Sequence, residues 1–187
     1  MRPRDNPFST DRVLKVRYRP QGWSWDGLLD RLAKMNYRAA IVGPEGRGKT
    51  TLMEDLGPRL SERGFGVQTV RLTRERSPFD RVWLRDFFAS VTPGHVILFD
   101  GAEQLSRPAW WRFRRLTRRA GGLVITSHRT GMLPTLVECE TDAALLAGII
   151  RDLLPSRSRD DAAELFARHR GNVRDALREL YDHYATA

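Results

Sequence analysis

The sequence has one cysteine, Cys139, and four histidines spread along its 187 residues. A single cysteine excludes a disulfide within the chain and a zinc site built from several cysteines, and the scattered histidines supply no ligand cluster. Long apolar runs are also missing: the longest, residues 143–150, is far shorter than the roughly 20 residues of a transmembrane helix. No apolar stretch follows the charged start of the chain. We therefore expect a cytoplasmic protein that makes no contact with a membrane.

Lysine is scarce as well. Lys15, Lys34 and Lys49 are the only lysines among 32 basic residues, so 29 of these residues are arginines. Against 23 acidic residues they give a formal net charge of +9. Such an excess is typical of proteins that bind anions, but a codon bias toward arginine produces the same composition. Composition alone leaves both explanations open. The 41% of hydrophobic residues are enough for a folded domain with a sizeable core.

Short apolar segments alternate with amphipathic segments through most of the chain. Apolar runs of four to eight residues predict buried strands, and apolar residues at helical spacing predict helices between them. This alternation favours a doubly wound α/β fold with a parallel sheet of about five strands. The predicted strands are residues 38–42, 65–72, 95–100, 123–126 and 135–139, with a further edge strand at 13–18.

Capping residues mark where several of the predicted helices begin. Ser24 is a predicted N-cap, and Ser77 followed by Pro78 is another. Inside the helix that follows residue 49, Gly57-Pro58 is expected to cause a kink or an early end. The helix after Ser77 is predicted to bury a stripe formed by Val82, Trp83, Phe87 and Val91.

The pattern changes after Thr141, where only helices are predicted, over residues 143–154, 160–170 and 173–184. We therefore predict two domains. Residues 1–141 form an α/β domain, in which residues 1–37 are an N-terminal segment and helix. Residues 142–187 form a small helical lid.

A glycine-rich loop with the pattern G-x-x-x-x-G-K-[ST] lies between the strand at 38–42 and the next helix, the context that this pattern needs. The glycines let successive backbone N–H groups point at a phosphate group, and the helix N-terminus adds partial positive charge. Lys49 is placed to reach the β- and γ-phosphates, Thr50 to bind Mg²⁺, and Thr51 to reach the α-phosphate. The predicted nucleotide-binding residues of this segment are Gly43, Pro44, Glu45, Gly46, Arg47, Gly48, Lys49, Thr50 and Thr51.

The buried strand at 95–100 ends on a carboxylate, Asp100. In phosphate-loop proteins an aspartate at this place helps to hold Mg²⁺, so Asp100 is the second predicted metal residue. Glu103 is the candidate for orienting and deprotonating the water that attacks the γ-phosphate. In many such ATPases the glutamate directly follows the aspartate, whereas here Gly101 does. This displacement leaves a second hypothesis open, a nucleotide-gated adaptor with little or no hydrolysis.

The phosphate loop, the strand that ends at Asp100, the polar residues 126–129 and the helical tail with 171–177 together resemble the AAA+ ATPases. More narrowly, the chain resembles small bacterial members of the ExeA, TniB and TnsC type and the related STAND ATPases. The segment Asn6-Pro7-Phe8 resembles the N-terminal segment that packs near adenine in ExeA-like proteins. The resemblance implies that the chain binds and hydrolyses ATP with Mg²⁺, that this drives a conformational or assembly switch, and that it has a protein partner.

The resemblance also assigns roles to residues outside the loop. Thr126 or Ser127 would hydrogen-bond the γ-phosphate or the attacking water. Arg174 of the lid would bind the γ-phosphate, since a guanidinium is always charged and forks onto phosphate oxygens. The residues implied to be catalytic are therefore Lys49, Glu103, Ser127 and Arg174. A neighbouring subunit usually completes such sites with an arginine, which implies a homo-oligomer, and the candidates are Arg118, Arg119 and Arg129.

The helix predicted at 108–119 carries five arginines, which are Arg112, Arg114, Arg115, Arg118 and Arg119. Trp110 and Phe113 are expected to turn toward the sheet, which leaves the arginines on the outside. Such a ridge could bind the phosphates of a nucleic acid. It could equally be an ordinary solvated face whose arginines pair with acids such as Glu103. A small-molecule or nucleotide kinase is a further alternative, but its lid would be inserted within the sheet region, whereas here the helical lid is C-terminal.

Overall fold

The computed structural model describes residues 6–13, 16, 22–72, 81–155 and 160–186, and its contacts divide the chain into two units. The first, which we call the sheet unit, comprises Pro20–Gly43 and Leu52–Glu138. The second, which we call the helical unit, comprises Met1–Arg19, Pro44–Thr51 and Cys139–Ala187. Most of the glycine-rich loop therefore belongs to the same unit as the C-terminal helices.

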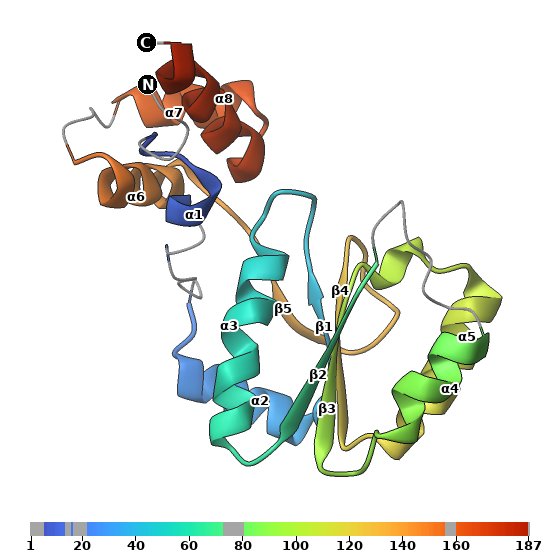
Figure 1. Cartoon of the computed structure of the whole chain (residues 1–187). Helices are drawn as coiled ribbons and strands as arrows, with labels where there is room; N and C mark the ends of the chain where they lie inside the picture. Colours follow the sequence, from blue (N-terminus) through green and yellow to red (C-terminus); the bar gives the residue numbers. More distant parts are fainter. Residues whose placement is uncertain (1–5, 14–15, 17–21, 73–80, 156–159, 187) are drawn as a thin grey trace. The chain divides into compact units, whose positions relative to one another are not determined.

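A five-stranded parallel sheet with the order β2-β3-β4-β1-β5 forms the centre of the sheet unit (Figure 1). This confirms the predicted fold class. At Val13 the prediction of an edge strand is wrong, because Val13 ends the short helix α1 (Thr10–Val13), and residues 14, 15, 17 and 18 lie outside the described residues. The strands are β1 (Arg38–Val42), β2 (Gly66–Arg71), β3 (His95–Asp100), β4 (Gly122–Ser127) and β5 (Thr135–Glu138).

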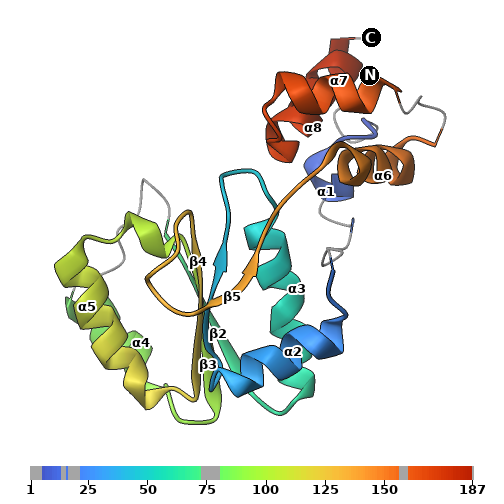
Figure 2. The same cartoon turned by 180° about the vertical axis from the view of Figure 1, so that it is seen from behind.

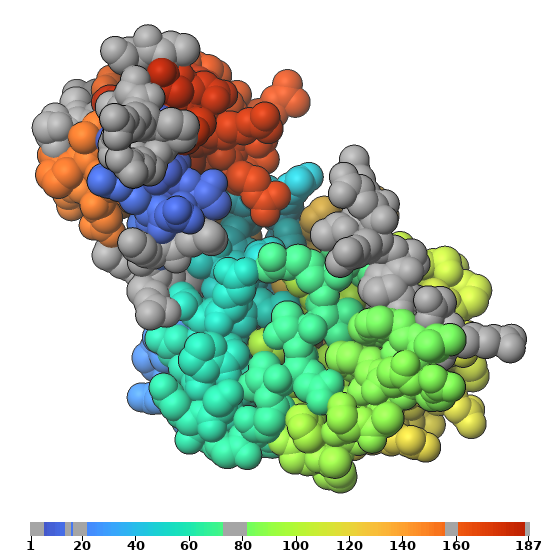
Figure 3. Space-filling model, viewed as in Figure 1, coloured from blue at the N-terminus to red at the C-terminus, as the bar shows by residue number. Residues whose placement is uncertain are grey.

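Helices cover both faces of this sheet. On one side lie α2 (Trp25–Lys34) and α3 (Lys49–Glu62), and on the other lie α4 (Arg81–Ala89) and α5 (Arg107–Leu116) (Figure 2). Alternate residues of β3 face opposite layers: Ile97 and Phe99 pack with Phe113 of α5, whereas the Leu98 side chain lies against α3. Burial on both faces explains why this strand is continuously apolar. Figure 3 views the sheet unit from the β2 edge, between the side chains of α3 and α4.

The stripe predicted for α4 is partly wrong. Val82 is 58% exposed, whereas Leu84 and Phe88 are buried, and Val91 is buried as predicted. Leu84 and Phe88 are four residues apart and therefore share a helix face, which turns Val82 outward. The proposed cap at Ser77 and Pro78 lies outside the described residues.

Helix α3 does not end early at its proline, because it continues through Pro58 to Glu62. A proline at this position leaves the carbonyl of residue 54 without its helical donor. Both Pro58 and Glu54 are exposed. Water can therefore satisfy that carbonyl, and the helix tolerates the proline.

The helical unit has its own core. Its C-terminal helices are α6 (Ala143–Leu153), α7 (Asp160–Arg168) and α8 (Val173–Thr186). The N-terminal segment is part of this core: Phe8 is buried beside Tyr184, with ring centroids 5.5 Å apart, and the Asn6 amide donates to the carbonyl of Tyr181 at 2.8 Å. Within the residues that the structure describes, no helix is long and apolar enough to span a bilayer.

Candidate functional site

The glycine-rich loop begins where β1 ends. The Gly43 N–H donates to the carbonyl of Ser127, the last residue of β4, at 3.1 Å, so the loop leaves the sheet at its carboxyl edge. Gly46 and Gly48 have φ values of 73° and 79°, which glycine adopts without strain. Lys49 opens α3, is only 8% exposed, and donates from Nζ to the carbonyl of Pro44 at 2.7 Å. The lysine ammonium therefore lies back over the loop that precedes it.

Asp100 ends β3 with both carboxylate oxygens engaged. The Thr126 hydroxyl of β4 donates to Oδ1 at 2.6 Å and accepts from the Gly101 N–H at 2.8 Å. On the other side, the Arg71 Nε of β2 lies 3.2 Å from Oδ2. Arg71 also binds Glu54 of α3 at 2.7 Å, and this hydrogen bond is the main reason why the pKa of Arg71 is raised. Residues of the two neighbouring strands thus hold the carboxylate of Asp100 at the carboxyl edge of the sheet.

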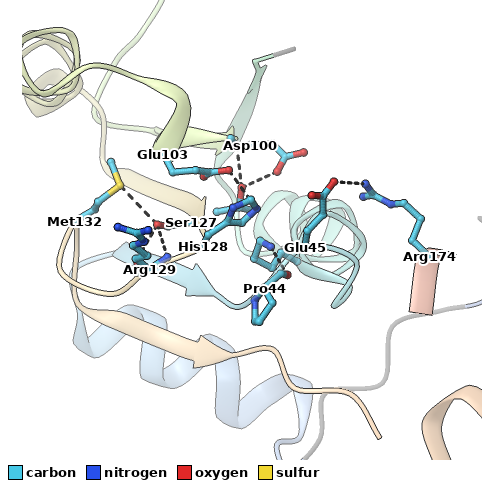
Figure 4. Close-up of polar contacts among 12 residues, drawn as sticks. Pro44, Glu45, Asp100, Glu103, Ser127, His128, Arg129, Met132 and Arg174 are labelled. Carbon is cyan, nitrogen blue, oxygen red and sulfur yellow. Dashed lines mark hydrogen bonds and ion pairs between the residues drawn. The ribbon is translucent and has the colours of Figure 1, made fainter. Parts of the chain in front are cut away.

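Ser127 follows Thr126 and is equally buried, at 1% exposure. Its hydroxyl donates to the carbonyl of Arg129 at 2.7 Å, accepts from the N–H of Arg129 at 3.1 Å, and lies 3.7 Å from the sulfur of Met132 (Figure 4). The contacts of the two hydroxyls differ accordingly. Thr126 orients Asp100, and Ser127 shapes the turn between β4 and β5.

Glu103 lies on the 3-10 turn η2 (Ala102–Gln104), three residues after Asp100. Its Oε1 is 3.5 Å from Nε2 of His128, which follows β4 (Figure 4). Its Oε2 is buried and has no hydrogen-bond partner within the described part of the chain. Buried polar atoms are normally hydrogen-bonded, and a water molecule is the usual partner where the protein supplies none. The carboxylate of Glu103 is therefore suited to hold a water molecule at this edge of the sheet.

Two further residues of the loop, Glu45 and Arg47, contact other parts of the helical unit, to which they belong. Glu45 lies 3.6 Å from Arg174 in the first turn of α8, and both side chains are exposed (Figure 4). The guanidinium of Arg47 binds Thr141 and the carbonyl of Arg170. The Lys49 ammonium thus lies against the loop itself, whereas Glu45 contacts α8 and Arg47 contacts the segments before α6 and after α7.

The residues predicted to bind Mg²⁺ have suitable chemistry for it. Across the described ranges there is no group of three or more His, Cys, Asp or Glu side chains that would hold a metal by themselves. Mg²⁺ commonly uses one or two protein ligands and completes its shell with water and phosphate oxygens. The Thr50 hydroxyl and the Asp100 carboxylate are oxygen donors of this kind. Each is the kind of ligand that Mg²⁺ uses when it is bound together with a nucleotide.

A second feature of the sheet unit is the arginine-rich end of α5. The α-helix ends at Leu116, and the 3-10 turn η3 (Thr117–Arg119) carries the last two arginines. None of the arginines of α5 and η3 forms an ion pair with a carboxylate of the described residues. The Glu103 carboxylate contacts His128 instead. The proposed pairing of these arginines with Glu103 is therefore wrong. The exposed arginines are Arg107, Arg112, Arg114, Arg115, Arg118 and Arg119, and Arg129 after β4 is exposed too.

The surroundings of this cluster are positively charged and partly aromatic. Trp111 is 66% exposed, and the Arg115 guanidinium lies 5.9 Å from the centre of its ring. Arg38 at the start of β1 donates to the carbonyls of Thr117 and Ala120, both at 2.8 Å. The pKa of Arg38 is lowered, chiefly by burial and then by the charges of two arginines of the cluster.

Two residues of the site were not found from the sequence, Arg71 and His128. Arg71 pairs with Asp100 in the parallel register of β2 and β3, so both lie at the same strand end. An alignment of the predicted strand ends could have indicated Arg71. The contact between His128 and Glu103 joins two turns that follow different strands, and no local pattern indicates it.

Comparisons with known proteins give one clear result. A scan against protein-family models finds no match, and a search of curated proteins finds none either. Among solved structures, a RuvB variant from Thermotoga maritima matches with a TM-score of 0.57 and 18% identity, over 90% of this chain and 64% of the RuvB chain. A second variant of the same protein matches with a TM-score of 0.52 and 18% identity, over 84% and 61%.

This chain thus spans slightly less than two thirds of the length of those RuvB chains. At 18% identity the likeness shows the fold alone, a parallel sheet flanked by helices on both faces and followed by a helical C-terminal segment. The narrower resemblance to the ExeA, TniB and TnsC type stays a prediction.

Proposed function

We propose that this chain binds ATP together with Mg²⁺ and hydrolyses it to drive a conformational or assembly switch. The observation that carries the proposal is the polar carboxyl edge of the sheet. The phosphate loop leaves β1 there, Asp100 ends β3, and β4, which lies between them, contributes Thr126. In open α/β sheets, ligands bind at the carboxyl ends of the strands.

The loop would bind the phosphates. Its backbone N–H groups and the N-terminus of α3 favour an anion, and Lys49 adds a full positive charge. In the present geometry the Lys49 ammonium has the Pro44 carbonyl as an acceptor, and a β- or γ-phosphate oxygen would be a stronger, charged one. Exchange of the carbonyl for a phosphate would keep this buried ammonium hydrogen-bonded.

Thr50 and Asp100 would hold Mg²⁺, which supplies charge neutralisation at the phosphates when it is bound. The position of Asp100 is well defined, because Thr126 and Arg71 hold its two oxygens from opposite sides. Glu103 would orient the attacking water through its unpartnered buried oxygen and accept a proton from it. His128 would keep the other oxygen of Glu103 in place.

Arg174 would approach the γ-phosphate from α8, where it now lies beside Glu45. Its exposure of 64% leaves it free to change partner. An arginine from a second copy of the chain would complete the charge stabilisation, and Arg118, Arg119 and Arg129 are all exposed enough to serve. This part of the proposal requires a homo-oligomer.

Nucleotide binding and phosphate release by purified protein test the proposal. Lys49→Ala is expected to abolish ATP binding, whereas Lys34→Ala, which removes an exposed lysine of α2, is the matched control and should bind normally. Tight ATP binding by Lys49→Ala would refute the site.

Glu103→Gln distinguishes an ATP-hydrolysing enzyme from a nucleotide-gated adaptor. If Glu103 is the general base, this variant should bind ATP but release phosphate about 10²- to 10⁴-fold more slowly. A wild-type protein that binds ATP and releases no phosphate under any condition would favour the nucleotide-gated adaptor, the alternative suggested by the presence of Gly101 directly after Asp100.

A specific observation also favours nucleic acid as a partner. The arginines of α5 and η3 are exposed and make no ion pair with a carboxylate of the described residues, and the exposed Trp111 lies among them. A phosphate backbone would supply the missing anions, and an aromatic ring can stack on an unpaired base.

Salt dependence distinguishes this surface from a merely solvated one. We expect DNA or RNA binding whose affinity falls with salt, and a variant with Arg112, Arg115 and Arg119 changed to Gln should show a slope smaller by about three ionic contacts. A control variant changes three exposed arginines that already pair with carboxylates, Arg63, Arg85 and Arg168. If the affinity depends on salt equally in the wild type and the first variant, the arginine cluster does not bind nucleic acid.

A further inference from the structure

Arg47 lies inside the phosphate loop, yet its guanidinium donates hydrogen bonds to the C-terminal part of the chain. Nη1 donates to the carbonyl of Thr141 at 3.2 Å and to its hydroxyl at 2.7 Å. Nη2 donates to the carbonyl of Arg170 at 3.3 Å, just after α7. The Thr141 hydroxyl in turn donates to the carbonyl of Gly171 at 2.8 Å. One loop side chain therefore joins the segment before α6 to the turn between α7 and α8.

Two side chains pack closely against the backbone of two glycines at this junction. A Cβ atom on Gly171, whose φ is 81°, would lie 2.5 Å from Nη2 of Arg47. A Cβ atom on Gly46, whose φ is 73°, would lie 1.7 Å from Oδ1 of Asn172. Asn172 is also the residue that caps α8, because its Oδ1 accepts from the N–H of Asp175 at 3.2 Å. Both glycines have positive φ values, which favour glycine, and a Cβ atom at either position would displace the neighbouring side chain.

The positive charge of Arg47 also favours its position beside the α7–α8 turn. The carbonyl of Arg170 follows the C-terminus of α7, where the helix dipole is negative and a guanidinium is favoured. All three acceptors of Arg47 named above are neutral oxygens of the helical unit. Its Nε is buried, with no hydrogen-bond partner in the described residues. A phosphate ligand is thus not needed to hold Arg47 in this conformation.

We propose that Arg47 is a positioning residue that couples the phosphate loop to the α7–α8 turn. This inference rests on the proposed nucleotide site and adds its regulation. A loop that closes on phosphates changes its backbone conformation at residues 45–48, and Arg47 carries that change to Gly171 and Asn172. The cap of α8, which lies just before Arg174 in the chain, is thereby stabilised when nucleotide is bound. Because coupling is reciprocal, loosening this turn weakens nucleotide binding by the same factor.

Hydrogen exchange of the amides of Asn172, Asp175 and Ala176 measures the coupling, since these N–H groups are bonded within the turn and the first turn of α8. Without nucleotide, Arg47→Ala should exchange about ten- to a hundredfold faster at these amides, the size expected for lost hydrogen bonds to a charged group. Amides of β3 and β4 should not change. Arg178→Ala, an exposed arginine of the same helix, is the control.

The nucleotide arm uses a non-hydrolysable ATP analogue with Mg²⁺. In the wild type the analogue should slow exchange at the three amides, and in Arg47→Ala, at a saturating concentration, it should bind without slowing them. Equal slowing in both proteins overturns the coupling, and equal exchange without nucleotide overturns the contact itself. If the wild type binds no analogue, the proposed function is refuted. The exchange rates of the wild type and Arg47→Ala without nucleotide still show whether Arg47 stabilises the turn.

Thr141→Val is a second, milder variant, which tests the same contact if Arg47→Ala does not fold. It keeps the side-chain shape but removes the hydroxyl that links Arg47 to Gly171. We expect the same three amides to accelerate, by less than in Arg47→Ala, because the bond from Arg47 to the Thr141 carbonyl remains. Unchanged exchange in a folded Thr141→Val protein counts against the proposal.

Discussion

Replacing Thr126 by valine tests how Asp100 is held at the edge of the sheet. The two side chains have nearly the same shape, so the change creates no cavity. It removes the donor to Asp100 Oδ1 at 2.6 Å and the acceptor for the Gly101 N–H at 2.8 Å. Thr126 is 1% exposed and Gly101 is buried, so water cannot replace the lost acceptor without a rearrangement.

The expected loss follows from these two bonds. Leaving the buried Gly101 N–H unsatisfied costs about 1–3 kcal/mol, and a hydrogen bond to a carboxylate contributes about 1.5–3 kcal/mol. The side chain of Asp100 is 15% exposed, so solvent recovers part of the second amount. We expect the free energy of unfolding of the sheet unit to fall by about 2–4 kcal/mol. Thr126→Ser keeps both bonds and loses one methyl group, at about 1 kcal/mol.

Tryptophan fluorescence in urea is a suitable assay, because it reports on one unit. All five tryptophans, Trp23, Trp25, Trp83, Trp110 and Trp111, belong to the sheet unit. Unfolding of the helical unit therefore leaves this signal largely unaffected. A valine variant that is as stable as the serine variant would refute the reasoning, because the expected loss from the two hydrogen bonds exceeds the loss from one methyl group.

Three further predictions concern other contacts. Gly46→Ala should destabilise the helical unit by at least about 1 kcal/mol, because of its positive φ and the approach of Asn172, and unchanged thermal unfolding by circular dichroism would contradict this. Arg71→Ala should lower the stability of the sheet unit by no more than about 1 kcal/mol, since the side chain is 48% exposed and solvent screens its ion pairs, and a larger loss in urea would contradict this. The pKa of Glu179 is lowered, chiefly by its hydrogen bond with His169, so its stabilising contribution is complete above the unfolded value of about 4.3 and is lost as the pH falls through the lower folded value. The stability difference between wild type and Glu179→Gln should therefore be present at pH 7 and disappear in acid, and a difference independent of pH would exclude this origin.

Most of the fold was predictable because its signals are local. The run at 95–100 is apolar because both faces of β3 are buried, and that same burial produces the pattern seen in the sequence. Ser24 caps α2 as expected, because a cap and the amide that it accepts from are three residues apart. The prediction for Val82 was wrong because α4 itself carries apolar and aromatic residues on more than one face. Spacing alone therefore did not determine which face is buried.

The sequence by itself determined the glycine-rich loop, the alternation of most strands and helices along the chain, and the carboxylate at the end of β3, because each depends on neighbours a few residues apart. The tertiary structure alone decided three partners: Thr126 for Asp100, His128 for Glu103, and the α7–α8 turn for Arg47. Thr126 is 26 positions from Asp100 in the chain, and Arg170 is 123 positions from Arg47. Such contacts depend on how strands and helices pack against one another, and the spacing of residues along the chain carries no record of that packing.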